Sequence, residues 1–206
     1  RPMEPGPSPV QGKSNGKAAS ADFVVRGALP EGTRMADFVR DGDRLLLAVT
    51  EGTRIEVFAV GDNLVPVATG NAPRSGRIYS LHWWQPRPDA PPLLAASFAV
   101  EENKAYSPSM GQTIQGVLFA LREGRLAPMG EEIPYLLGSF DRDGDGVPET
   151  LLGQCFDRDI FVGDRVREIR LKEGTPAIDE PSFPIPRPVS VQGTVFADLT
   201  GDGRTE

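Results

Sequence analysis

The sequence predicts an all-β fold made of short antiparallel strands. Apolar or alternating runs of strand length, such as Arg44–Val49 and Ile55–Val60, follow one another and are separated by Gly, Asp and Asn. Short strands with regular turn signals between them are typical of all-β meanders. The 206 residues include 23 glycines and 20 prolines, which suits a chain with many turns. No segment of comparable length shows the 3.6-residue period of an amphipathic helix.

Charge and cysteine content narrow the classes of function. The formal net charge is −7, which argues against nucleic-acid binding because the chain offers no basic field to displace counterions. Cys155 is the single cysteine, so no intrachain disulfide is expected, and its apolar surroundings in the sequence favour a buried side chain. No stretch reaches the ~18 apolar residues of a membrane span, so we expect no transmembrane segment.

The nine residues from Asp141 to Glu149 read Asp-Arg-Asp-Gly-Asp-Gly-Val-Pro-Glu. Carboxylates at the first, third, fifth and ninth positions put four oxygen donors on one short loop. They repel one another unless a cation neutralises them, and Ca²⁺ takes 6–8 oxygen ligands in flexible geometry. Mg²⁺ demands a stricter octahedron. Glycines at the fourth and sixth positions permit the positive φ angles that let a short loop wrap around an ion.

A second copy of this pattern runs from Asp198 to Glu206, as Asp-Leu-Thr-Gly-Asp-Gly-Arg-Thr-Glu. Its third position is Thr200, a neutral donor, so the second site is expected to bind a cation more weakly. The alternative for both copies is an ordinary Asp-Gly turn between strands.

The two loops differ from an EF-hand and resemble another calcium motif. An EF-hand needs a Glu at position 12 and flanking helices, whereas position 12 of the first loop is Leu152 and the flanks are short apolar runs. The pattern resembles the calcium loop of FG-GAP/VCBS-type repeats, which joins the first two strands of a blade in integrin-like β-propellers. The resemblance implies Ca²⁺ as cofactor, and as ligands Asp141, Asp143, Asp145, the Val147 carbonyl and Glu149, with Asp198, Thr200, Asp202, the Arg204 carbonyl and Glu206 in the second loop.

The pattern of runs and turns predicts a linker followed by repeated units. Residues 1–21 are rich in Pro, Gly and Ser and are expected to form a flexible linker. Residues 22–206 are expected to form β-propeller-type blades, each a four-stranded antiparallel meander that must stack on its neighbours. The units span about 34–76, 77–134 and 135–188, with a partial unit at 189–206. A closed propeller needs at least ~4 blades, so we expect a part of a larger propeller.

Turns within the units support the meander. Glu51-Gly52, Glu123-Gly124 and Glu173-Gly174 are expected to be turns, the first before a third strand and the others before a fourth strand. Arg40–Asp43 in the first unit and Gln85–Pro92 in the second occupy the place of the calcium loop, and both are expected to be metal-free.

Two other segments offer candidate binding surfaces. The insert Glu101–Gln112 carries Tyr106 and acidic and amide side chains, and could be a binding loop or a solvated hairpin tip. His82-Trp83-Trp84 could form an aromatic platform for a sugar ring. Alternation places Trp83 and Trp84 on opposite faces of a strand, which favours packing in the core.

The motifs favour a binding module over an enzyme. His82 is the single histidine, and G-x-S-x-G, Walker and zinc motifs are absent from the sequence. We therefore expect a non-catalytic, calcium-stabilised repeat module that binds a protein or a carbohydrate. The alternative is an ancillary or partial propeller domain of a secreted polysaccharide-active enzyme.

The same motifs suggest a location outside the cytosol. Weak calcium loops are useful where calcium is plentiful, so we expect a secreted, periplasmic or cell-surface location, including association with an outer membrane. The chain begins at Arg1, and we expect it to be a processed piece with an anchor or another domain upstream.

Overall fold

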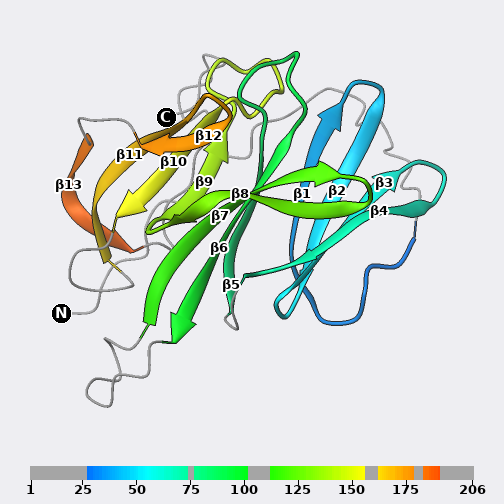
Figure 1. Cartoon of the computed structure of the whole chain (residues 1–206), viewed down its shortest axis with the longest axis horizontal. Coiled ribbons are helices and arrows are strands. Elements are labelled where there is room, and N and C mark those ends of the chain that lie inside the picture. The colour runs from blue at the N-terminus through cyan, green and yellow to red at the C-terminus, as the bar shows by residue number, and fades with distance from the viewer. Residues whose placement is uncertain (1–26, 74–76, 102–111, 156–161, 179–182, 191–206) are drawn as a thin grey trace, which may run out of the picture.

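The computed structural model describes residues 27–73, 77–101, 112–155, 162–178 and 183–190. These residues form β-strands and turns, with no helix among them (Figure 1). The predicted all-β class is therefore confirmed for this part of the chain. The predicted linker at 1–21 lies outside it.

The first four strands form an antiparallel meander. They are β1 (Thr33–Asp41), β2 (Arg44–Glu51), β3 (Arg54–Val60) and β4 (Leu64–Asn71). Each strand pairs with the next along the chain. Two-residue turns join β1 to β2 and β2 to β3, and each contains a glycine with positive φ, which an L-residue adopts at a cost.

The second meander joins the first in one eight-stranded sheet. Its strands are β5 (Ile78–Trp84), β6 (Leu93–Glu101), β7 (Gln112–Arg122) and β8 (Arg125–Ile133). The last strands of the two meanders, β4 and β8, pair in parallel where Thr69 lies opposite Arg125. The strand order is β1-β2-β3-β4-β8-β7-β6-β5, and β1 also lies against β5. The sheet is therefore nearly closed and barrel-like.

The third meander forms a separate five-stranded sheet. Its strands are β9 (Leu136–Phe140), β10 (Thr150–Cys155), β11 (Val162–Lys172) and β12 (Thr175–Ile178), and β13 (Phe183–Ser190) pairs with the first half of β11. Of the predicted fourth unit at 189–206, only Val189 and Ser190 are described, and they end β13. Its prolines occupy alternate positions, which an edge strand tolerates because one side of it needs no N–H donors. Residues 191–206 lie outside the described part.

The Glu-Gly turns lie where the sequence places them. Glu123 and Gly124 have φ angles of 48° and 77°, and Glu173 and Gly174 have 54° and 78°. Two successive residues with positive φ are typical of the type I′ turns that match the twist of paired strands. These turns lead into β8 and β12, the fourth strands of their meanders, while the turn at Gly52 leads into β3.

Two apolar cores separate the three meanders, with the second meander in the middle (Figure 1). The first core includes Leu46, Ile55, Trp83, Phe98 and Phe119, from the first and second meanders. The second core includes Trp84, Leu118, Leu137, Leu151 and Ile169, from the second and third meanders. Trp83 and Trp84 are thus buried on opposite faces of β5, as alternation predicts, and core packing is confirmed over a sugar platform.

Buried polar groups fix β9 against the second meander. The Leu137 N–H donates to Ser97 Oγ at 2.8 Å, and the Leu137 carbonyl accepts from Ser80 Oγ at 2.9 Å. Gly116 on β7 allows this approach, because a Cβ there would lie 2.6 Å from Leu137 Cγ. These contacts set the position of β9, and β9 leads directly into the acidic loop.

Candidate metal centre

The acidic loop connects β9 to β10. Its ends are held by the antiparallel pair, since Phe140 lies opposite Thr150. Gly144 and Gly146 have φ angles of 80° and 90°, so both adopt the left-handed conformation that the sequence predicts. An added Cβ at Gly146 would meet nothing within 4 Å, which means that its backbone conformation, rather than crowding, requires glycine there.

Carboxylates bond to main-chain N–H groups within the loop and hold its curvature. Asp141 accepts from the Gly144 N–H at 2.7 Å and from the Gly146 N–H at 2.6 Å. Both carboxylate oxygens of Glu149 lie 3.2 Å from the main-chain nitrogen of Arg142 and accept its N–H. Hydrogen bonds of this kind, donated by main-chain N–H groups to nearby acidic side chains, stabilise turns.

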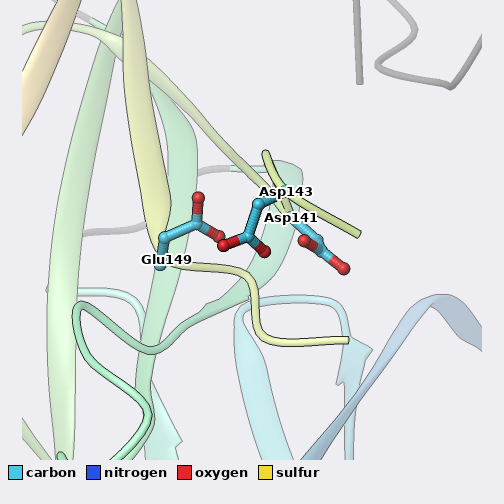
Figure 2. Close-up of side chains that lie close together, drawn as sticks. All are labelled: Asp141, Asp143 and Glu149. Carbon is cyan, nitrogen blue, oxygen red and sulfur yellow. The ribbon is translucent and has the colours of Figure 1, made fainter. Parts of the chain in front are cut away.

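Three of the expected ligands lie together. Asp141, Asp143 and Glu149 each place one carboxylate oxygen within 4.8 Å of the other two (Figure 2). Asp143 is exposed, whereas Asp141 and Glu149 are half-buried. Carboxylates at this separation repel one another, and a hard cation among them would remove that repulsion.

The other two expected ligands of this loop lie outside the group. The Asp145 side chain is exposed and accepts from the Val147 N–H at 2.8 Å. The Val147 carbonyl accepts from the Glu149 N–H at 2.9 Å. A carbonyl oxygen has two lone pairs, so this bond leaves one acceptor position on Val147.

The end of β5 supports the acidic loop from the second meander. The Trp84 indole N–H donates to the Glu149 carbonyl at 2.9 Å, and the Gln85 N–H donates to the Pro148 carbonyl at 3.0 Å. Sequence reasoning missed both bonds. A buried indole usually has an acceptor for its N–H, which is a signal that a partner exists but does not identify it.

The structure describes only some of the remaining predicted segments. Gln85–Pro92 connects β5 to β6, and within it Asp89 pairs with Arg87 at 3.1 Å. Glu101 and Gln112, the ends of the predicted insert, lie opposite each other on β6 and β7. The insert between them, with Tyr106, lies outside the described residues, as does the second acidic loop with Asp198, Thr200, Asp202, Arg204 and Glu206. Cys155 ends β10, and its side chain also lies outside the description.

A second group of titratable residues lies where β1 meets β5. Burial raises the pKa of Asp37, partly opposed by the hydrogen bond from the Trp83 N–H and by the charge of His82. Burial lowers the pKa of His82, partly opposed by the negative charge of Asp37. No sequence pattern indicates this pair, because the two residues lie on different meanders.

Comparisons with known proteins leave the family undefined. A scan against models of known protein families finds no match to the chain, and a search of curated proteins finds none either. Within the part of the chain that the structure describes, no helix has the length and apolar character needed to cross a membrane. In the described residues, the fold and the candidate site define an all-β protein with an acidic loop between two paired strands.

Proposed function

We propose that the chain is a non-catalytic, calcium-stabilised repeat module of the FG-GAP/VCBS type. The observation that carries the proposal is the group formed by Asp141, Asp143 and Glu149, which each place one carboxylate oxygen within 4.8 Å of the other two. The spacing of the group, its two left-handed glycines and its place between the first two strands of a meander match the family's calcium loop. Oxygen donors of this kind suit Ca²⁺.

In this proposal each residue of the first loop has a defined role. Asp141, Asp143 and Glu149 supply side-chain oxygens to the ion, and Asp145 and the Val147 carbonyl supply further ligands. The second loop provides the equivalent ligands Asp198, Thr200, Asp202, the Arg204 carbonyl and Glu206. The ion acts by linkage, because it binds the folded loop and not the unfolded chain. At 100 times the dissociation constant, this adds about 2.7 kcal/mol of stability per site.

We further propose that the three meanders are blades of a β-propeller. Their face-to-face stacking and the contacts of β1 with β5 and of β5 with β9 support this arrangement. Four-stranded meanders that stack around an axis are the building blocks of propellers. The chain is then a part of a larger propeller.

The module is proposed to act outside the cytosol, where calcium is plentiful. Its location is secreted, periplasmic or at the cell surface. Its ligand is a protein or a carbohydrate, which it binds without catalysing a reaction. Rigid β scaffolds with long connecting loops commonly present such binding sites.

The test is thermal unfolding in EDTA and across a calcium titration, with magnesium as the comparison ion. The wild-type chain is expected to melt several degrees higher with calcium, and Asp143→Asn is expected to lose most of that rise. Asp89→Asn is the matched control, since Asp89 is also an exposed loop carboxylate and pairs with Arg87. Equal melting temperatures with and without calcium would reduce the loop to an ordinary Asp-Gly turn.

A further inference from the structure

Glu149 takes part in two sets of contacts that meet at one residue. Its carboxylate belongs to the acidic group and bonds to the Arg142 N–H. Its main-chain carbonyl accepts the indole N–H of Trp84 from the second meander. The neighbouring Pro148 carbonyl accepts the Gln85 N–H. The end of the acidic loop is therefore held from outside the third meander.

Trp84 connects this loop to the second core. The side chain is 2% exposed and belongs to the core that includes Leu137 and Leu151. Leu137 lies on β9 and Leu151 on β10, the strands that enter and leave the loop. One indole thus packs between the two meanders and also bonds to the loop that joins those strands.

We propose that Trp84 is a positioning residue for the acidic loop, which it couples to the packing between the second and third meanders. The indole holds the Glu149 main chain and thereby limits where the Glu149 carboxylate can lie. A change of conformation in the loop is passed to Trp84 by the same bond. The effect on calcium binding rests on the proposed function, whereas the conformational coupling does not depend on an ion.

Trp83 provides a matched control at the adjacent position. It is also buried, and its indole N–H donates to a main-chain carbonyl, that of Asp37, at 3.1 Å. It packs in the first core, on the opposite face of β5. Trp83→Phe and Trp84→Phe therefore remove the same chemical group from buried sites, but only the second substitution removes a bond to the loop.

The first experiment measures amide hydrogen exchange in metal-free buffer containing EDTA. Trp84→Phe leaves the Glu149 carbonyl without its indole donor, so the amides of Gly144, Gly146 and Val147 are expected to exchange roughly three- to tenfold faster than in Trp83→Phe. The comparison is made at equal global stability, with urea added to the more stable variant. Equal exchange of these amides in the two variants would overturn the coupling.

The second experiment adds calcium and separates the two proposals. Trp84→Phe is expected to bind calcium roughly three- to tenfold more weakly than Trp83→Phe, while Trp83→Phe binds like the wild type. If all three proteins bind calcium with equal affinity, the coupling is rejected and the calcium function stands. If none of them binds calcium, the calcium function is rejected, and the exchange experiment alone decides the coupling.

A third measurement decides the coupling even where Trp84→Phe does not fold. In Trp83→Phe the remaining tryptophan is Trp84, which reports on its own surroundings by fluorescence. Adding Asp141→Ala removes the acceptor of the Gly144 and Gly146 N–H groups and so disturbs the loop. The coupling predicts a shift of Trp84 emission without any metal, and an unchanged spectrum would contradict it.

Discussion

Trp83 donates two hydrogen bonds to Asp37. The Trp83 main-chain N–H donates to Asp37 Oδ2 at 2.7 Å, and the Trp83 indole N–H donates to the Asp37 carbonyl at 3.1 Å. The Trp83 carbonyl in turn accepts the Ser139 hydroxyl from β9. Since β5 ends the order of the eight-stranded sheet, these contacts satisfy main-chain groups that no further strand pairs with. They hold β1 and β9 against the same strand.

Removing the Asp37 carboxylate should weaken the contact between β1 and β5. Asp37→Ala leaves the Trp83 N–H without its acceptor, and we expect a loss of about 1–3 kcal/mol in the free energy of unfolding, measured with urea. Asp37→Asn keeps an acceptor oxygen and should lose less. Asp89→Ala removes an exposed ion pair and should change stability by about 0.5 kcal/mol or less. A loss no larger for Asp37→Ala than for Asp89→Ala would contradict the role of Asp37.

Stability should fall as the pH drops below about 6.5 because of His82. Burial lowers its pKa from the ordinary value of 6.5, so the unfolded chain binds a proton there at pH values where the folded chain does not. Asp37 acts in the opposite direction. Its pKa is raised by burial, so the charged Asp37 destabilises the folded chain at pH values above its folded-state pKa. This cost disappears as the pH falls through that pKa towards the ordinary value of 3.8.

His82→Gln separates the two effects. The variant lacks the imidazole, so urea unfolding at pH 7.5 and 5.5 should show a smaller loss of stability for His82→Gln than for the wild type. Asp37→Asn should show a larger loss of stability than the wild type, because without the Asp37 charge the pKa of His82 falls further. Parallel losses in all three proteins would show that His82 does not govern this pH range.

A methyl group at Gly116 should disturb the packing of β9 against β7. A Cβ there would lie 2.6 Å from Leu137 Cγ and 3.0 Å from the Tyr135 carbonyl oxygen, which is main chain and yields little. We expect Gly116→Ala to cost about 1–3 kcal/mol, seen as a lower melting temperature. Gly61→Ala is the control, since its nearest neighbour would be the Asn63 carbonyl at 4.0 Å. Equal melting temperatures for the two variants would contradict the close approach of Leu137 to Gly116.

The two acidic loops should bind calcium independently. Titration calorimetry is expected to show two ions per chain, the weaker one at the second loop because Thr200 is a neutral donor. Asp143→Asn should remove the tighter ion and Asp202→Asn the weaker one. A single class of site that survives in Asp143→Asn would assign the calcium to the second loop alone.

Local patterns allowed the strands and turns to be predicted. Alternating runs such as Ile55–Val60 and turns such as Glu123-Gly124 depend on neighbours in the sequence, and both lie where predicted. Most of β13 was not predicted as a strand, and its alternating prolines are tolerated because it lies at the edge of its sheet. The pairing of β4 with β8 joins residues far apart in the chain and leaves no periodic signal.

The candidate site was predictable in its spacing and not in its detail. The motif brought Asp141, Asp143 and Glu149 together, because two left-handed glycines fold the loop back on itself. Asp145 lies apart from them because its carboxylate caps the Val147 N–H. The Trp84 bond to Glu149 depends on how the second and third meanders pack, which a linear motif does not encode.

The parallel contact between β4 and β8 also bears on aggregation. Each of these strands ends its own meander and would otherwise present a row of unpaired N–H and C=O groups to solvent. Such edges serve as templates for strand pairing with another molecule, the usual route by which β-rich proteins aggregate. Because Thr69 lies opposite Arg125 and the Thr69 N–H donates to the Gly124 carbonyl at 3.3 Å, the two edges partly cover each other. The contact that joins the two meanders into one sheet thus also protects the chain from polymerising through these edges.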